Sequence, residues 1–296
     1  MNPNQGWIVI NTWLQWETFD KQFDQLISAA ADRGVTLEKR TNSWLAANIT
    51  SFSDSDLPAF AIAMDKDIAV LRLLEARGVP VFNKAQAVAD CDDKSLSFAA
   101  LEAAGVAQPA TVVVPLRFQG VRCQQWQESG FIDSAVSRLG LPLVAKLARS
   151  SWGQGVELIE TRAGLCNFLE RLEQRPAVLQ EFVSVSAGRD ARLYFAGDEC
   201  LAAMIRTGAE GDFRSNIAGG GHGRSWEPSA KHIAMGRAAK DALGLDFAGI
   251  DLLFDADELP LVCEVNSNAQ FMTLAETTGI DVARGIIDYI LDALEP

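Results

Sequence analysis

Phe247-Ala-Gly-Ile-Asp-Leu-Leu-Phe254 is followed, after the short polar segment Asp255-Ala-Asp-Glu258, by Leu259-Pro-Leu-Val-Cys-Glu-Val-Asn-Ser-Asn268. The two longer runs are apolar and rich in leucine or β-branched residues, which is typical of buried strands. The polar segment between them has the length and composition of a hairpin turn. The two strands are therefore predicted to be antiparallel neighbours.

Three polar side chains interrupt this predicted hairpin. Because strand side chains alternate, Glu264 and Asn266 share one face, and Asp251 lies on the partner strand at a matching height. Burying two carboxylates in an apolar sheet is costly unless a cation or a donor compensates. Such oxygen ligands suit Mg²⁺, which uses one or two carboxylates plus substrate phosphates. A Mg-nucleotide site with these three ligands is one interpretation, and strand-end acids facing solvent are the other.

The composition limits the classes of protein to which the chain can belong. Its 296 residues predict two or three domains, and its formal charge of −13 disfavours a nucleic-acid partner, which needs a basic face. Five cysteines with no CxxC pair fit a reducing cytoplasm better than a disulfide framework or a zinc site. No signal peptide and no apolar run of membrane-spanning length is visible. We therefore expect a soluble, cytoplasmic protein with no membrane partner.

Alternating strands and helices are predicted for the first part of the chain, up to about residue 92. Apolar runs indicate strands at residues 7–10, 35–38, 58–63 and 79–82, with helices at residues 20–33 and 65–77. This order predicts βαβ units and a parallel sheet, as in a small Rossmann-like domain. No G-x-G-x-x-G follows the first strand, so direct dinucleotide binding is not expected there.

The remainder of the chain is predicted to be mixed α/β. Strands are expected at residues 112–115, 141–147, 156–160, 177–183, 192–196 and 200–206, and helices at residues 92–104, 163–173, 231–243 and 281–294. The helix at residues 92–104 is expected to be capped by the acids at its N-terminus. The polar segment that ends at Gly130 is interpreted as a loop or linker.

Lys146 is embedded in the apolar run Leu141–Leu147, directly before the turn Ser150-Ser-Trp-Gly-Gln-Gly155. Small residues let backbone N–H groups approach a phosphate, and a lysine adds a point charge. The turn does not match the P-loop pattern G-x-x-x-x-G-K-[ST], which excludes a P-loop. Lys146 is interpreted either as a phosphate ligand or as a strand-edge lysine that extends into solvent.

A polar loop is predicted from Gly211-Asp-Phe-Arg-Ser-Asn216 and the glycine-rich Ala218-Gly-Gly-Gly-His-Gly223 that follows. An arginine and an asparagine on either side of Ser215 can hold a transferring phosphoryl group from the side opposite a metal. On its own, the segment would be interpreted as an ordinary surface loop. Its meaning depends on the motifs that accompany it.

In their order along the chain, these motifs resemble the ATP-grasp superfamily, and within it the RimK-like α-L-glutamate ligase branch. The stretches that carry the resemblance are Asp92-Asp-Lys94, Pro142-Leu-Val-Ala-Lys146, Gly153-Gln-Gly155, Leu179-Gln-Glu-Phe182, Arg189-Asp-Ala-Arg192, Glu210-Gly-Asp-Phe-Arg-Ser-Asn216, Ala248-Gly-Ile-Asp251, Glu264-Val-Asn266 and Thr277-Thr-Gly-Ile-Asp281. The resemblance implies an α/β fold with three parts. A Rossmann-like pre-ATP-grasp domain (residues 1–92) would precede a linker with the ATP-grasp lid subdomain (93–182) and a large subdomain with the metal site (183–296).

The resemblance also implies roles for individual residues. The implied nucleotide ligands are Lys94 and Lys146 at the phosphates, Glu181, Phe182 and Val183 at the strand that holds the adenine, Asp190 near the ribose, and Arg214, Ser215 and Asn216 against the phosphates. The implied metal ligands are Asp251, Glu264 and Asn266, with Glu264 bridging two Mg²⁺ or Mn²⁺ ions. The implied catalytic residues are Arg206, Arg214 and Asn216.

The reaction that the resemblance implies is the ATP-driven joining of a carboxylate to an amine. The carboxylate attacks the γ-phosphorus to give an acylphosphate and ADP, and the amine then displaces phosphate to form an amide. The protein would contribute positioning and charge neutralisation. The implied substrates are an amino acid and a peptide, protein tail or metabolite, and association of identical chains stays open. A non-catalytic ATP-binding module and a phosphotransferase that stops at the phosphorylated substrate are the alternatives.

Two further features stay open. Many members of the branch have a small-Pro-Gly turn after the metal-binding asparagine, whereas this chain continues with Ser267-Asn-Ala-Gln-Phe-Met272. Because proline and glycine fix a particular backbone path, this loop is expected to take another path, and glutamate as a substrate stays open. Asp65-Lys66-Asp67 is interpreted as a helix cap, with a contact to substrate as the alternative.

Overall fold

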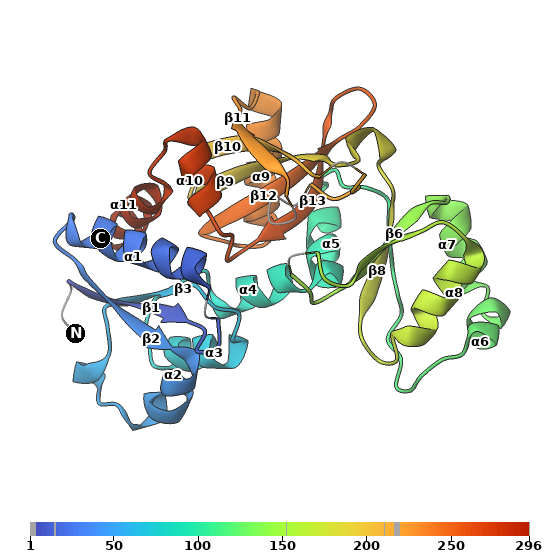
Figure 1. The fold of residues 1–296 in the computed structure, drawn as a ribbon. Coiled ribbons are helices and arrows are strands. Elements are labelled where there is room, and N and C mark those ends of the chain that lie inside the picture. Colours follow the sequence, from blue (N-terminus) through green and yellow to red (C-terminus); the bar gives the residue numbers. More distant parts are fainter. Residues whose placement is uncertain (1–3, 15, 152, 210, 216–219, 296) are drawn as a thin grey trace.

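The computed structural model describes residues 4–14, 16–151, 153–209, 211–215 and 220–295. The described chain is a mixed α/β fold built on three sheets (Figure 1). In Figure 1 the parallel sheet lies at the lower left and the four-stranded antiparallel sheet at the right. The five-stranded antiparallel sheet lies between and above them.

The parallel sheet is formed by the first part of the chain, as predicted. Its order is β2 (Thr36–Thr41), β1 (Gln5–Ile10), β3 (Phe60–Ala63) and β4 (Val81–Phe82), and its helices are α1 (Glu17–Ala31), α2 (Asn42–Asn48), α3 (Ile68–Ala76) and α4 (Ala85–Asp92). The helix predicted over residues 65–77 begins only at Ile68. The reason is that Asp67 is its N-cap and accepts a hydrogen bond from the Val70 N–H.

The four-stranded antiparallel sheet follows. Its order is β5 (Thr111–Val113), β8 (Ala177–Glu181), β6 (Leu143–Leu147) and β7 (Val156–Ile159), and its helices are α6 (Cys123–Glu128), α7 (Phe131–Leu139) and α8 (Arg162–Arg171). Helix α5 (Lys94–Ala103) precedes the sheet and begins at the predicted acidic cap, since Asp93 accepts from the N–H groups of Ser95 and Leu96.

The prediction of a loop up to Gly130 is wrong, because α6 lies within that segment. Trp126 is buried there and its ring packs against Phe131, with 5.1 Å between ring centroids. Tertiary packing of one aromatic side chain can stabilise a short helix whose polar composition does not predict one.

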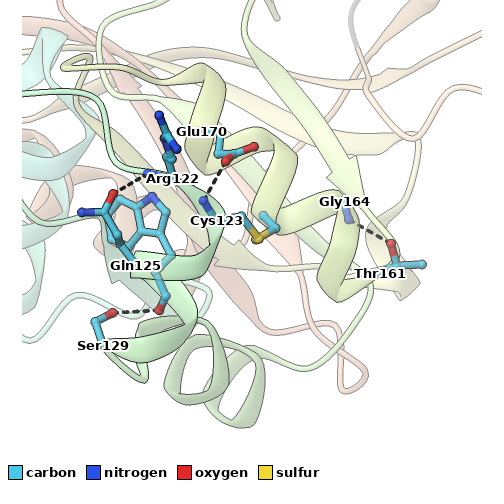
Figure 2. The surroundings of a disulfide bond; sticks show 9 residues. Arg122, Cys123, Gln125, Ser129, Thr161, Gly164 and Glu170 are labelled. Carbon is cyan, nitrogen blue, oxygen red and sulfur yellow. Dashed lines mark hydrogen bonds between the residues drawn. A yellow bond between two sulfur atoms is a disulfide. The ribbon is translucent and has the colours of Figure 1, made fainter.

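The cysteine pattern, interpreted as fitting a reducing cytoplasm better than a disulfide framework, did not predict the disulfide that the structure contains. Cys123 of α6 and Cys166 of α8 form a disulfide, and their Cα atoms are 5.2 Å apart, within the range that a disulfide requires. Figure 2 shows the bond beside the hydrogen bond that the Cys123 N–H donates to Glu170 at 2.7 Å. The two cysteines are 43 residues apart in the sequence, so no short-range spacing motif predicts that they pair. The cytoplasmic location, which rested on the cysteine pattern, stays a prediction.

The five-stranded antiparallel sheet contains the predicted hairpin of residues 247–268. Its order is β11 (His222–Ser225), β10 (Glu199–Thr207), β9 (Arg189–Ala196), β12 (Phe247–Phe254) and β13 (Pro260–Asn266), and its helices are α9 (Ala230–Ala242), α10 (Met272–Thr278) and α11 (Val282–Leu294). The interpretation of His222 as part of a glycine-rich loop is wrong, because His222 begins β11 and is paired with Thr207. An edge strand this short has little apolar pattern by which to recognise it.

One apolar cluster joins the parallel sheet to the five-stranded sheet. Ile8 of β1, Phe23 of α1, Phe247 of β12 and Ile286 of α11 belong to it and are almost fully buried. A separate cluster that includes Trp126 fills the interior between the four-stranded sheet and helices α6 to α8. The four-stranded sheet therefore has its own core. None of the described helices has the length and apolar content that crossing a bilayer requires.

Candidate active site

The β12–β13 hairpin brings the three predicted metal ligands next to one another. The strands are antiparallel as predicted, with Asp251 opposite Glu264 and Gly249 opposite Asn266. The register shifts by one residue directly after Asp251, so Cys263 is the extra residue of a β-bulge. Bulges change the direction of neighbouring side chains, and this one lies beside Glu264. The two carboxylates thus come from one pair of facing residues, and the amide comes from two residues further along β13.

Strand β9 lies beside β12 and carries two charged residues that pair across the sheet. Arg192 is opposite Asp251 and donates through Nε and Nη2 to its two carboxylate oxygens, at 2.6 Å each. Asp190 is opposite Arg206 of β10 and accepts from its Nε at 2.7 Å and from its Nη2. Arg206 Nη2 also lies 3.0 Å from Asp251 Oδ2. We call these four residues the charge network.

The charge network is buried, so its charges depend on one another. None of the four side chains is more than 13% exposed. Burial by itself would raise the pKa of Asp251, but the guanidinium groups of Arg192 and Arg206 outweigh burial and hold that pKa below its ordinary value. Burial opposes the charge of Arg206 as well, yet Asp251 and Asp190 raise its pKa above the ordinary value. Asp251 and Arg206 are therefore charged at neutral pH.

Two lysines from other elements reach the same end of the hairpin. Lys94 is the first residue of α5, and its Nζ lies 3.1 Å from Glu264 Oε1. Lys146 of β6 donates to Gln180 Oε1 at 2.6 Å and to the Cys263 sulfur at 3.7 Å. Since β6 belongs to the four-stranded sheet and Cys263 to the five-stranded sheet, the two predicted phosphate ligands lie where these sheets meet.

The segment at residues 211–215 packs against the Asp190 end of the charge network. Ser215 Oγ donates a hydrogen bond to Asp190 Oδ2. The segment also lies against Gly208, the residue after β10, because a Cβ on Gly208 would be 2.0 Å from the Arg214 carbonyl oxygen. Only glycine allows so close an approach of two backbones. The predicted ligand Ser215 is thus joined to the network.

Arg214 is an exposed member of the same segment. Its guanidinium pairs with Asp212 at 3.0 Å, and its side chain is 45% exposed. A Cβ placed on Gly153, in the turn after β6, would lie 3.6 Å from Arg214 Nη1. Arg214 therefore extends toward the turn that the sequence analysis proposed for phosphate binding. Asn216, predicted to act beside it, lies outside the described residues.

The predicted adenine strand is β8, which ends at Glu181. The Glu181 N–H donates to the Ala110 carbonyl at 2.9 Å, and its Oε2 accepts from the Ala110 N–H at 3.1 Å. Phe182 packs edge-on against Phe213, with 6.1 Å between ring centroids. The Val183 carbonyl accepts from the Ser186 N–H in the turn that leads to β9. Within the described ranges, no hydrogen bond or ion pair links Glu181 or Val183 to the charge network.

The donor set around Glu264 fits a hard divalent cation. Two carboxylates and one amide oxygen are ligands of the kind that Mg²⁺ prefers. Asn266 Nδ2, Ser267 Oγ and Asn268 Oδ1 are buried and have no hydrogen-bond partner among the described residues, and such a row of polar atoms indicates a place for water or ligand. In the part of the chain that the structure describes, no three His, Cys, Asp or Glu side chains form a metal centre. A bound ion would therefore need phosphate or water ligands as well.

Arg192 is a member of the site to which the sequence motifs assigned no role of its own. The sequence did indicate that Arg192 faces the site, because Asp190 and Arg192 are two residues apart on an apolar strand and so share one face, as Glu264 and Asn266 do. The missing information is the pairing of β9 with β12, which are separated by β10 and β11 along the chain. Sequence periodicity indicates which face a charge takes, but not which distant strand supplies its partner.

Comparison with known proteins agrees with this geometry. A family model described as a RimK-like ATP-grasp domain matches residues 91–290. The chain is also 34% identical over 240 residues to the probable alpha-L-glutamate ligase of Mannheimia succiniciproducens, an alignment that covers 80% of this chain and 76% of that protein. The chain belongs to the RimK-like ATP-grasp family. It is an ATP-dependent ligase that forms C–N bonds.

Two further comparisons, with a curated relative and with a solved structure, concern the family and the fold of this RimK-like chain. Beta-citrylglutamate synthase B of Danio rerio is 32% identical over 241 residues, which cover 80% of this chain and 57% of that protein. The crystal structure of D-alanine–D-alanine ligase from Bacillus anthracis complexed with ATP matches with a TM-score of 0.73 at 17% identity, covering 98% of this chain and 97% of that one. The latter likeness shows the fold. The family and the α/β fold class predicted from the motifs are both confirmed.

Proposed function

We propose that this RimK-like protein joins a carboxylate to the amine of an amino acid through an acylphosphate, with ATP as the phosphoryl donor. The observation that carries the proposal is the buried charge network, in which Arg192 and Arg206 lie against Asp251, directly opposite Glu264. A transferring phosphoryl group and an acylphosphate carry several negative charges. Guanidinium groups fixed in a buried site stabilise such charge without rearrangement of solvent.

The steps of the reaction follow from these charges. Lys94 and Lys146 bind the phosphates of ATP at the junction of the two antiparallel sheets. The substrate carboxylate attacks the γ-phosphorus, the bond to the β-phosphate breaks, and ADP leaves with the electron pair. The amine then attacks the acyl carbon and loses a proton, while phosphate leaves with the bridging oxygen. Arg206, Arg214 and Asn216 hold the negative charge that develops on the transferring group.

We propose that Asp251, Glu264 and Asn266 hold two Mg²⁺ or Mn²⁺ ions, which is the number that the motifs imply. When bound, such an ion neutralises the phosphate oxygens as charge develops on them. Glu264 is the more available carboxylate, because it is 36% exposed and pairs with Lys94, whereas both oxygens of Asp251 accept from arginine. Asp190 has both oxygens engaged by Arg206 and Ser215, so its proposed place near the ribose would require those bonds to open.

Glutamate is the first amino acid to test as the amine substrate. The word glutamate is shared by the names of the bacterial and zebrafish relatives.

The loop after Asn266, which departs from the small-Pro-Gly turn, is held by the first part of the chain. Asn268 Nδ2 donates to the Met64 carbonyl and the Phe271 N–H donates to Gln22, both at 2.8 Å. We propose a peptide, a protein tail or a small acid as the carboxylate substrate.

We also propose the division into residues 1–92, 93–182 and 183–296 as the working parts of the enzyme. Each range contains one of the three sheets. The separate core of the four-stranded sheet suits a lid that moves as a unit over the nucleotide, with Glu181, Phe182 and Val183 as its hinge and adenine contact. A cytoplasmic location and an association of identical chains are further expectations on which the reaction does not depend.

ADP formation is expected to require ATP, Mg²⁺, a carboxylate and an amine together. The measurement couples ADP release to an optical assay, with L-glutamate as the amine and citrate or a peptide ending in glutamate as the carboxylate, and each component is omitted in turn. ADP formed at full rate without the amine would identify a phosphotransferase. Nucleotide binding without ADP formation across a broad panel of acids and amines would identify a non-catalytic module. Either result would contradict the proposal.

A further inference from the structure

The parallel sheet has a topological switch point to which no residue role has yet been assigned. Its order, β2-β1-β3-β4, places β2 on one side of β1 and β3 on the other, so the direction of the connections reverses between β1 and β3. Open α/β sheets bind ligands outside the carboxyl ends of their strands at such a switch point. The first residue after β1 is Asn11, and Asp65 follows β3 by two residues.

Asp65 is buried at this position with half of its carboxylate unpaired. The residue is 6% exposed. Oδ1 accepts from Asn11 Nδ2 at 3.1 Å and from the Lys66 N–H at 2.7 Å. Oδ2 is also buried, and no hydrogen-bond partner for it exists among the described residues. A buried carboxylate oxygen without a donor is costly, so the site calls for a ligand that donates hydrogen bonds.

Asp65 has no ion pair among the described residues. The Lys66 ammonium pairs with Asp92 and donates to Ser151 Oγ at 3.2 Å. Asp67 caps α3 and accepts from Asn42 Nδ2 at 3.2 Å. Burial raises the pKa of the Asp65 carboxyl and the nearby Asp67 charge adds to that effect, while the hydrogen bonds from Asn11 and Lys66 and the Lys66 charge oppose it only in part. A positively charged ligand would offset both the cost of burying the Asp65 carboxylate and its repulsion by Asp67.

This position adjoins the candidate active site. Asn268 Nδ2 donates to the carbonyl of Met64, the residue before Asp65, at 2.8 Å. Asn268 Oδ1 is a second buried acceptor with no partner among the described residues. Asn268 is two residues beyond the proposed metal ligand Asn266. Both residues with an unpaired acceptor oxygen therefore adjoin Met64, Asp65 along the chain and Asn268 through its hydrogen bond.

We propose that Asp65, together with Asn268, binds the ammonium group of the amine substrate. An ammonium group has three N–H donors and a positive charge, which matches two unpaired acceptor oxygens and an uncompensated carboxylate. The two substrates would then be bound by groups of opposite charge. Arg192 and Arg206 attract the acylphosphate, whereas Asp65 attracts the amine. This assignment rests on the proposed ligase function and identifies an α-amino acid, bound through its ammonium group, as the amine.

The variant Asp65→Asn tests the assignment, because it keeps the shape of the side chain and removes its charge. A hydrogen bond to a charged group contributes about 1.5–3 kcal/mol, so the KM for L-glutamate, or for whichever standard L-amino acid supports turnover, is expected to rise by about 10- to 100-fold. The KM for ATP is expected to stay unchanged. Hydroxylamine, a small neutral nucleophile that needs no ammonium site, is expected to give the same rate of hydroxamate formation with the variant as with the wild type.

Asp54→Asn is the matched control, because Asp54 belongs to the same part of the chain but is exposed and pairs with Arg77. Its KM for the amino acid is expected to stay at the wild-type value. An unchanged amino-acid KM in Asp65→Asn, or an equal loss of rate with the amino acid and with hydroxylamine, would overturn the assignment. A wild-type protein that forms hydroxamate but accepts no α-amino acid would also overturn it. Failure of the wild type to form either hydroxamate or an amino-acid amide would instead overturn the ligase function, and the assignment with it.

Discussion

Replacing Glu264 with glutamine is expected to lower Mg²⁺-dependent ADP formation by about 10³-fold, the rate equivalent of roughly 4 kcal/mol of lost transition-state stabilisation. Glu264 is the more accessible carboxylate of the proposed metal set, and its only ion pair in the described part of the chain is with Lys94. Glutamine keeps the size of the side chain and removes the charge that would hold the cation. Asp251 is not expected to compensate on its own, because both of its oxygens already accept hydrogen bonds from arginine.

The loss should appear in binding as well as in turnover. The affinity of the Glu264→Gln protein for ATP is expected to become nearly independent of Mg²⁺ concentration, which calorimetric titration at several Mg²⁺ concentrations would measure. Glu258→Gln is the matched control, since Glu258 lies in the turn of the same hairpin and pairs with the exposed Arg189. Its turnover is expected to remain at the wild-type rate. Full turnover by Glu264→Gln would remove the basis for the metal site.

The second large effect is on stability. Replacing Arg192 with methionine is expected to lower the free energy of unfolding by about 3–5 kcal/mol, because removing one partner of a buried ion pair leaves the other charge uncompensated. Arg192 Nε is the hydrogen-bond donor to Asp251 Oδ1, and both side chains are buried. Urea unfolding without nucleotide, followed by circular dichroism, measures the change.

Two further variants separate this cause from a general effect of losing an arginine. Arg171→Met breaks an exposed ion pair with Glu157 and is expected to change the free energy of unfolding by no more than about 1 kcal/mol. Adding Asp251→Leu to Arg192→Met removes the unpaired carboxylate and should recover part of the loss, although Arg206 then lacks one of its partners. Equal destabilisation by Arg192→Met and Arg171→Met would show that the charge network does not contribute to folding in this way.

The local features of the fold could be predicted from the sequence, whereas the long-range pairings could not. The β12–β13 hairpin was predictable because strand alternation and a polar turn determine which residues face each other. The pair Arg192–Asp251 depends on β12 lying beside β9, from which it is separated along the chain by β10 and β11. The Cys123–Cys166 disulfide likewise joins two helices through tertiary packing. Neither arrangement leaves a periodic pattern in the sequence.

Asp65 and Asp67 show where sequence reasoning stops. Capping and a substrate contact were both consistent with Asp65-Lys66-Asp67, because an acid before a helix serves either purpose. In the structure Asp67 is the cap of α3, whereas Asp65 bonds to Asn11 across the switch point and keeps one oxygen unpaired. The two acids therefore have different surroundings. Only the neighbouring strand and the loop at Asn268 distinguish them.

The transfer of oxygen-18 from a labelled carboxylate substrate to inorganic phosphate tests the central claim most directly. In an acylphosphate route, one carboxylate oxygen bridges carbon and phosphorus and leaves with phosphate when the amide forms. Mass spectrometry of the phosphate released in a complete reaction is therefore predicted to show one atom of oxygen-18 for each amide made. Phosphate that carries no label while the amide accumulates would contradict the account.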